Sequence, residues 1–199
     1  RKLWVDTHDI TAVELNPQIA KIYQDFFPND KVIVADAHQY LLEHFKEFEF
    51  IWASPPCPSH SRARYWGSFG ENRTIIYPDM TLYQEIILLE HYCKETKWVV
   101  ENVKPYYEPL IVAQECGRHL FWSNFPIKKI DFPTRFTPNQ GFGSLQKAYG
   151  VDLTKYNLPP DKDNRVIIRN MVEPELGLHI LNESQRNIQS ELFNQGGHK

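Results

Sequence analysis

Cys57 is the side chain in this sequence best placed for covalent chemistry. It stands in the run "SPPCP" (residues 54–58), directly after the apolar stretch "FEFIWA" (48–53). Proline lacks a backbone N–H and fixes its own φ, so this run continues neither a strand nor a helix. It forms a stiff turn that holds the thiol in one place. His60, Arg62 and Arg64 follow closely. Because nearby cations lower the pKa of a thiol, the sequence predicts a nucleophilic thiolate at this turn.

Acidic and amide side chains stand at the ends of three other apolar stretches. They are Glu14 near the end of "ITAVEL" (10–15), Asp36 at the end of "KVIVAD" (31–36), and Glu101 with Asn102 at the end of "KWVVEN" (97–102). A single acid at a strand end is most often a helix cap or a solvated loop residue. Four stretches in succession that end in chemically active residues favour a shared site instead.

Helical patterns separate these apolar stretches. They are "PQIAKIYQDFF" (17–27), "HQYLLEHF" (38–45) and "DMTLYQEIILLEHYCKE" (79–95). Strands that alternate with helices are typical of a parallel sheet covered by helices. In such a sheet, ligands bind outside the carboxyl ends of the strands. We therefore expect the Cys57 thiol and the three carboxylates to line one edge of the sheet.

The composition is that of a globular protein. Of the 199 residues, 42% are hydrophobic and 24% are charged, which suits one α/β domain with its own core. No apolar run reaches the roughly 18 residues of a membrane span, and the chain starts without a signal-peptide pattern. A net charge of −3 argues against a uniformly basic nucleic-acid-binding protein but leaves room for a local basic face.

Cysteine usage points to a reducing compartment. The three cysteines are unevenly spaced, so they do not make a disulfide framework. They also lack C-x-x-C spacing, which argues against a zinc site. We expect a cytoplasmic protein that uses no metal.

Six motifs, in order along the chain, resemble those of the C5-cytosine DNA methyltransferases. They are "AVELNP", "VADAH", "SPPC", "ENV", "RHLFWSNFP" and "RNMVEPELGLHIL". The resemblance covers roughly residues 10–182. It is specific because "SPPC" and "ENV" follow consecutive strands and both acids stand upstream. It implies an α/β, Rossmann-like methyltransferase fold: a mostly parallel sheet with helices on both faces.

The resemblance implies covalent catalysis on a cytosine that has left the base stack. The Cys57 thiolate would add to C6 and so make C5 able to accept a methyl group. Glu101 would grip the ring near N3, and Asn102 would hold the loops of Cys57 and Glu101 together. The implied catalytic residues are Cys57, Glu101 and Arg118.

The methyl donor implied by the resemblance is S-adenosylmethionine. Glu14 would bind its ribose hydroxyls and Asp36 its adenine amino group. The implied cofactor-binding residues are Glu14, Leu15, Asp36, Ala37, Pro55 and Asn170. The implied partner is double-stranded DNA, contacted by His60, Arg62, Arg64 and Asn102.

Two features depart from the family pattern. The family begins with a strand and a Gly-rich turn that holds the methionine part of the cofactor, and nothing here matches them. That strand would be central, so we expect its neighbours to be unpaired and the N-terminus to be truncated or complemented by another segment. In "CGRHLFW", either Arg118 or His119 fills the supporting position. We favour Arg118 because a guanidinium always carries its charge.

The chain divides into three expected regions. Residues 1–127 form the catalytic and cofactor-binding domain, and 128–168 form a small, irregular target-recognition region. Residues 169–199 pack back on the catalytic domain. The segment 58–73, with its arginines, aromatic residues and glycines, is expected to be a mobile loop that closes over DNA.

The sequence favours a bacterial or phage DNA (cytosine-5-)-methyltransferase that works alone or beside a restriction enzyme. Two alternatives stay open. One is a cytosine-5 methyltransferase of tRNA, which the short recognition region allows. The other is a methyltransferase-like regulatory subunit without activity, which the absent Gly-rich turn favours and the intact Cys57 and Glu101 oppose. The oligomeric state and the recognised DNA site are left open.

Overall fold

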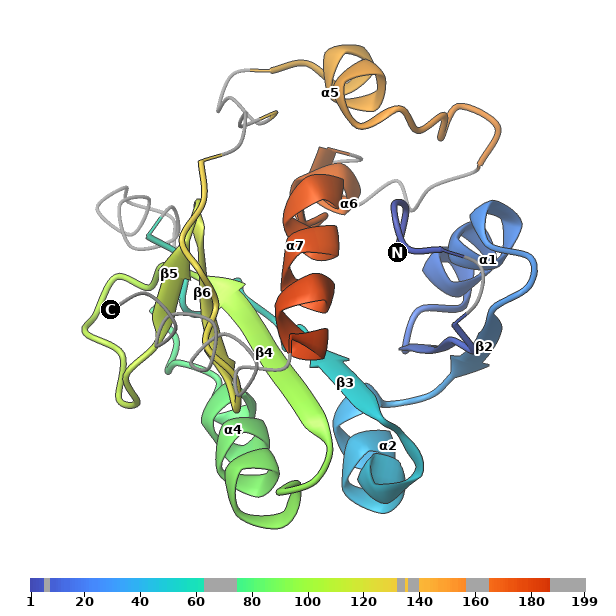
Figure 1. Cartoon of the computed structure of the whole chain (residues 1–199). Helices are drawn as coiled ribbons and strands as arrows, with labels where there is room; N and C mark the ends of the chain where they lie inside the picture. The colour runs from blue at the N-terminus through green and yellow to red at the C-terminus, as the bar shows by residue number, and fades with distance from the viewer. Residues whose placement is uncertain (6–7, 63–74, 132–134, 136–139, 157–164, 187–199) are drawn as a thin grey trace, which may run out of the picture.

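The computed structural model describes residues 1–5, 8–62, 75–131, 135, 140–156 and 165–186. It has an α/β architecture (Figure 1). The helices are α1 (Pro17–Phe26), α2 (Ala37–His44), η1 (Phe45–Glu47), α4 (Thr81–Tyr92), α5 (Phe142–Tyr149), α6 (Arg165–Arg169) and α7 (Pro174–Gln185). The strands are β1 (Thr11–Glu14), β2 (Lys31–Val34), β3 (Phe50–Ala53), β4 (Lys97–Val103), β5 (Gln114–Cys116) and β6 (His119–Ser123).

The strands form two sheets rather than one. β1 and β2 pair in parallel, and the second sheet has the order β3–β4–β6–β5. Within it β3 and β4 are parallel, whereas β6 is antiparallel to both β4 and β5. The alternating strands and helices of the first half are those expected from the sequence. Among the described residues no backbone pairing joins β1 to β3, the place where the expected central strand would lie.

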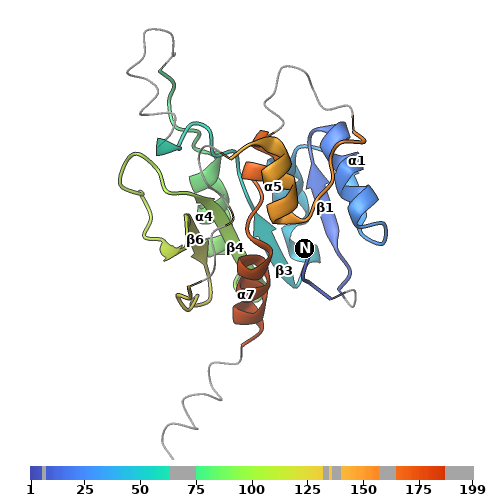
Figure 2. The ribbon, with the colours of Figure 1, turned by 90° about the horizontal axis from the view of Figure 1, so that it is seen from above.

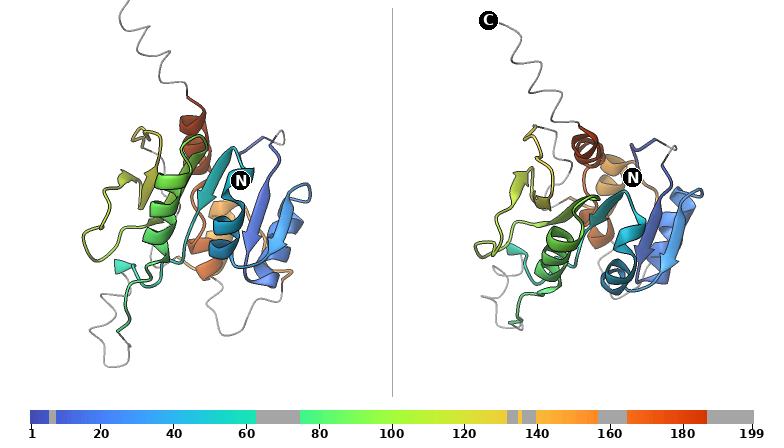
Figure 3. Two further views of the ribbon diagram at one scale, coloured as in Figure 1. Left: turned by 90° about the horizontal axis from the view of Figure 1, so that it is seen from below. Right: turned by 60° about the horizontal axis from the view of Figure 1, so that its bottom comes forward.

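Helices cover both faces of the larger sheet (Figures 1 and 3). On one face α4 packs its apolar side chains on β3, β4 and β6, with side chains from α2 and η1 at the border. On the other face Leu176 and Ile180 of α7 pack against Val99 and Phe121. Val99, Phe121, Leu176 and Ile180 are all fully buried, so β4 and its partner β6 form the centre of the molecule.

The first four residues link parts of the fold that are distant in sequence. Arg1 forms an ion pair with Asp30 at 2.8 Å, beside β2. The Lys2 ammonium donates to the carbonyl oxygen of Tyr149 at the end of α5. The Trp4 indole donates to the carbonyl of Gly177 in α7. The N-terminus therefore lies between β1 and β3 (Figure 2), where its side chains bridge the two sheets and the C-terminal helices.

The region expected to be irregular contains a regular helix. α5 ends at Gly150, whose left-handed φ of 60° suits glycine. Leu145 and Tyr149 of α5 are buried, and they form a core cluster with Ile22 of α1 and Ile168 of α6. The prediction of an irregular region was therefore wrong for these residues. The apolar side chains at 142, 145 and 149 do have helical spacing. The glycines and prolines around them are typical of irregular structure, and for that reason the helix was not predicted.

Candidate active site

The ends of β3 and β4 bring the two central motifs together. These strands are parallel and in register, with Ala53 opposite Val100. Ser54 directly follows β3, and Glu101 is the residue of β4 that follows Val100. These two residues therefore lie side by side at the carboxyl edge of the sheet. One residue further, the Asn102 side-chain amide donates to the carbonyl of Pro55 at 3.0 Å. This hydrogen bond ties the proline turn of Cys57 to the strand that carries Glu101.

Glu101 is a buried acid whose proton affinity is raised. Its side chain is almost inaccessible, and burial raises its pKa to about 7. A hydrogen bond with Ser54 and the charge of Arg118 oppose this rise, while the charge of Glu173 adds to it. Near neutral pH Glu101 can therefore hold a proton that an exposed glutamate would lose. A carboxyl group in this state can give a proton to a ring nitrogen.

The Cys57 thiol is half-buried, and its pKa lies above the ordinary value. Burial is the largest cause and the charge of Glu101 the next, whereas Arg118 lowers the pKa. The expectation that several cations depress this pKa was wrong. His60 is buried and burial lowers its own pKa, so it is neutral, and the Arg62 guanidinium donates to the carbonyl of Pro105.

His119, rather than Arg118, is the direct neighbour of Glu101. The β4–β6 register places it diagonally across from Glu101, and its Nε2 lies 3.5 Å from Glu101 Oε1. Burial, followed by the charges of Arg118 and Lys104, lowers the pKa of His119 to about 3. The imidazole beside Glu101 is therefore neutral at physiological pH.

Arg118 is turned toward the C-terminal helices and acts on the site through its charge. Its guanidinium donates to the carbonyls of Arg169 and Met171 at 3.0 and 2.9 Å. Its Nε lies 3.4 Å from a carboxylate oxygen of Glu173. Glu173 is almost fully buried and was not among the predicted site residues. The sequence signal for Glu173 was Pro174, the first residue of α7. Proline is common at the first position of a helix, so it marks Glu173 as the residue that directly precedes the helix.

Three of the four predicted DNA-binding residues are placed by the structure. His60 and Asn102 are each 1% exposed, so neither side chain can reach a phosphate or a base edge, and that prediction is corrected. The His60 ring is hydrogen-bonded to the Tyr107 hydroxyl, and the Asn102 side-chain amide donates to the carbonyl of Pro55. Arg62 is exposed. Arg64, with most of the expected closing loop at 58–73, lies outside the described residues.

The comparisons with known proteins place the chain in a family. The sequence model of the C-5 cytosine-specific DNA methylase family matches residues 5–108, which include Cys57, Glu101 and Asn102. The chain belongs to this family. Members of the C-5 cytosine-specific DNA methylase family transfer a methyl group from S-adenosylmethionine to C5 of cytosine. No curated protein matches the chain.

Among solved structures, the chain is similar to a crystal structure of the Spodoptera frugiperda DNMT2 E260A/E261A/K263A mutant. The two sequences are 16% identical, and the TM-score is 0.40. The match covers 64% of this chain and 47% of the other. The chain thus spans about half the length of that solved structure.

The residues expected to hold the methyl donor of the methylase family follow β1 and β2. One oxygen of Glu14 accepts the backbone N–H of Asn16 at 2.8 Å. One oxygen of Asp36 caps α2 by accepting the N–H groups of His38 and Gln39. Leu15 is 68% exposed. Two carboxylates that can accept from hydroxyl and amino groups, beside an exposed apolar side chain, fit the adenosine part of S-adenosylmethionine.

The other three predicted cofactor residues are placed less closely together. Ala37 is exposed at the start of α2, next to Asp36. Pro55 is buried and its carbonyl accepts from Asn102. Asn170 is exposed in the turn after α6, directly between the two carbonyl groups that Arg118 binds. Of the six predicted cofactor residues, the structure therefore places four close together, at the carboxyl ends of β1 and β2: Glu14, Leu15, Asp36 and Ala37.

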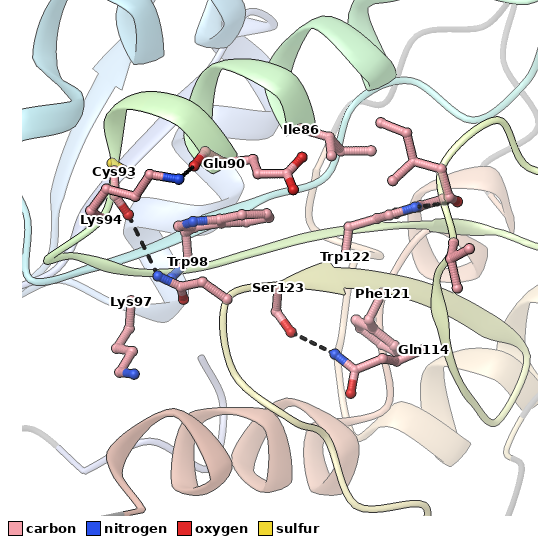
Figure 4. A pocket seen from close by; sticks show the side chains of 13 residues that line it. Ile86, Glu90, Cys93, Lys94, Lys97, Trp98, Gln114, Phe121, Trp122 and Ser123 are labelled. Carbon is pink, nitrogen blue, oxygen red and sulfur yellow. Dashed lines mark hydrogen bonds between the residues drawn. The ribbon is translucent and has the colours of Figure 1, made fainter.

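A cavity of about 320 Å³ opens at the opposite end of β4 (Figure 4). Trp98 and Trp122 lie between α4 and the sheet there, and Lys94 and Lys97 stand near its rim. None of the predicted site residues is among the described residues that line it. The candidate chemistry therefore belongs to the carboxyl edge of the sheet rather than to this cavity.

No described helix has the length and apolar character needed to cross a membrane. No group of three or more His, Cys, Asp or Glu side chains within the described ranges is arranged to hold a metal ion.

Proposed function

We propose that this chain acts as an S-adenosylmethionine-dependent DNA (cytosine-5-)-methyltransferase. One observation carries the proposal. A cysteine in a rigid proline turn stands beside a buried acid of pKa about 7, and Asn102 bonds the two segments together. This pairing supplies the two groups that the reaction needs, a sulfur nucleophile and a proton donor.

The first step is the addition of the Cys57 thiolate to C6 of cytosine. A sulfur lone pair forms the S–C6 bond, and the electrons of the C5–C6 double bond move toward N3. Glu101 gives its proton to N3, which prevents negative charge from building up on the ring. The ring is then an enamine whose C5 is nucleophilic. Neutral His119 beside Glu101 leaves the acid its proton, whereas a cation in direct contact would favour the carboxylate.

The second half of the reaction regenerates Cys57. S-adenosylmethionine would supply an electrophilic methyl group when bound: C5 of the ring forms the new C–C bond as the methyl–sulfur bond breaks, and its electron pair leaves with the sulfur of S-adenosylhomocysteine. A base then removes the C5 proton, the electrons restore the C5–C6 double bond, and the C6–S bond breaks to release the thiolate, while N3 returns its proton to Glu101. Glu14 and Asp36 would accept hydrogen bonds from the ribose hydroxyls and the adenine amino group, with Leu15 against the base.

Duplex DNA is the proposed substrate. The target atom lies inside the base stack, so the cytosine must turn out of the helix, at a cost of a few kcal/mol. The family to which the chain belongs is described as C-5 cytosine-specific DNA methylase, and Arg62 is exposed beside the Cys57 turn. The second candidate substrate is tRNA, which the short region 128–168 allows because it leaves little room for reading a DNA sequence.

The test is methyl transfer from labelled S-adenosylmethionine to duplex DNA and to tRNA, measured side by side. Cys57→Ser is the control. We expect label in DNA with the native chain and none with Cys57→Ser. Label in tRNA alone would overturn the DNA assignment. Transfer by Cys57→Ser at the native rate would overturn the nucleophile, and binding of S-adenosylmethionine without transfer to either substrate would favour a regulatory module.

A further inference from the structure

We infer that His60 and Tyr107 are positioning residues that fix the Cys57 turn relative to Glu101. This inference rests on the proposed function, because it assigns a role to the geometry of the nucleophile. The turn that follows Cys57 is tight. The backbone N–H groups of His60 and Ser61 both donate to the carbonyl of Cys57, at 3.0 and 3.1 Å. Any movement of His60 is therefore passed directly to the Cys57 backbone.

The His60 side chain points inward and is bonded there. It is 1% exposed, and its Nδ1 lies 2.5 Å from the Tyr107 hydroxyl oxygen. Tyr83 of α4 is close enough to Tyr107 to contribute, after burial, to the raised pKa of the Tyr107 hydroxyl. The His60–Tyr107 hydrogen bond thus ties the turn of the nucleophile to the segment that follows β4. A buried hydrogen bond of this kind favours one arrangement, because leaving either partner unpaired is costly.

The backbone holds the same two segments together a second time. The N–H of Tyr106 donates to the carbonyl of His60 at 3.1 Å, and Ser61 and Pro105 form an isolated antiparallel bridge. Residues 105–107 follow directly after β4, which carries Glu101. The segment that anchors the nucleophile is therefore continuous with the strand that places the acid.

This connection matters because the proposed reaction needs two distances at the same time. The Cys57 sulfur must reach C6 of the cytosine while the Glu101 carboxyl group lies at N3. Displacement of a reacting group by about 1 Å lowers a rate about a hundredfold. The Pro55–Asn102 bond fixes the turn on the side before Cys57. His60 and Tyr107 fix it on the side after Cys57, so the thiol is held from both directions.

The test compares Tyr107→Phe with the native protein. This variant removes one hydroxyl and keeps the ring. We expect kcat for methyl transfer to fall by about tenfold to a hundredfold, with the Kd for S-adenosylmethionine and the melting temperature little changed. His60→Asn, which can still offer a polar atom to Tyr107, is expected to retain more activity than His60→Ala. The matched control is Tyr92→Phe, since Tyr92 is 70% exposed at the end of α4.

A second readout does not depend on turnover. Cys93 and Cys116 are buried at 4% and 0% exposure, so iodoacetamide reports on Cys57 in the native protein, and Cys57→Ser gives the background. We expect alkylation of Cys57 to be several-fold faster in Tyr107→Phe, because a looser turn exposes the thiol. Unchanged alkylation and unchanged kcat would overturn the positioning role. A kcat loss accompanied by an equal loss of cofactor affinity would also overturn it.

The two proposals fail in different ways. If Cys57→Ser transfers methyl groups at the native rate, the proposed function is wrong. The alkylation rates of Tyr107→Phe and Tyr92→Phe still decide whether the turn is fixed by Tyr107. If Cys57→Ser is inactive and Tyr107→Phe behaves as Tyr92→Phe does, the proposed function stands and the positioning role is wrong.

Discussion

At the scale of single residues, Glu101 and Cys57 are coupled through charge. The Glu101 charge raises the pKa of the thiol, and burial raises the pKa of Glu101 to about 7. As long as Glu101 keeps its proton, its charge does not oppose the thiolate, although burial still does. Arg118, whose charge lowers the pKa of both groups, favours the anions without direct contact.

Glu101→Gln tests the protonation state of this acid. We expect kcat to fall by about 10²-fold or more, since an amide cannot transfer a proton to N3. The raised pKa means that the folded state binds the proton more tightly than the unfolded state does. The native protein therefore loses stability as pH rises from about 4.5 to about 7, by about 3 kcal/mol in total.

The stability part of this prediction is measured by urea denaturation of both proteins at pH 5 and pH 8. Glutamine does not ionise, so the stability of Glu101→Gln does not fall as pH rises through the pKa of Glu101. The free energy of unfolding of the variant is expected to exceed that of the native protein clearly at pH 8 and much less at pH 5. An equal difference at both pH values would contradict a raised pKa at Glu101.

His119 offers a second test at the residue scale. His119→Gln keeps a neutral hydrogen-bonding side chain next to Glu101, so the alkaline limb of the kcat–pH profile is expected to stay near pH 7. His119→Arg places a cation there, which favours the carboxylate and moves that limb down by about one pH unit or more. Identical profiles for the two variants would show that His119 does not act on Glu101.

The adjacency of the Cys57 turn and Glu101 was predictable, because "SPPC" and "ENV" follow apolar runs that pair in a parallel sheet. The burial of His60 was not. A polar residue in a proline-rich turn normally suggests an exposed position, and its partner Tyr107 is 47 residues away in sequence. The choice between Arg118 and His119 also needed the strand register, since adjacent residues at a strand start take different directions.

At the scale of elements, α2 begins where the proposed adenine site lies. Asp36 caps this helix and also stands at the carboxyl end of β2. The general expectation that an acid at a strand end caps the following helix is therefore correct for Asp36. The proposed contact with adenine involves the same side chain. The two roles can be separated by substitution, because serine caps helices well and alanine does not.

Asp36→Ala and Asp36→Ser are both expected to weaken S-adenosylmethionine binding by about tenfold, the cost of one polar contact. Alanine is expected to cost about 1 kcal/mol of stability through the lost cap, and serine much less. Calorimetric titration and thermal melting give the two quantities separately. Native cofactor affinity in both variants would place the adenine site elsewhere.

At the scale of the whole molecule, the two sheets are joined by side chains rather than by backbone pairing. Arg1 pairs with Asp30 beside β2, the Trp4 ring packs against Phe50 and Trp52 of β3, and α5 packs on α1 through Leu145 and Tyr149. The alternation of strands and helices predicted the elements. It did not predict these contacts, because they join residues 29 or more positions apart and no local pattern records them.

Within the described ranges no strand pairs with the facing edges of β1 and β3, and this leads to a prediction about the fold. A version of the chain with an N-terminal extension of an apolar strand of about five residues and a Gly-rich turn is expected to unfold at a higher urea concentration. It is also expected to bind S-adenosylmethionine more tightly. Both effects follow if the strand pairs with β1 and β3 and completes one sheet. A matched extension with proline at alternate positions cannot pair and should have neither effect.

The central claim is that Cys57 forms a bond to C6 of cytosine in DNA. The most direct measurement uses duplex DNA with 5-fluorocytosine at the target bases, together with S-adenosylmethionine. Fluorine at C5 cannot leave as a proton, so the adduct persists after the protein is denatured. Mass spectrometry is predicted to find the nucleotide attached to the peptide that contains Cys57, and no adduct with Cys57→Ser. An adduct on another residue, or none while methyl transfer to ordinary DNA proceeds, would contradict the account.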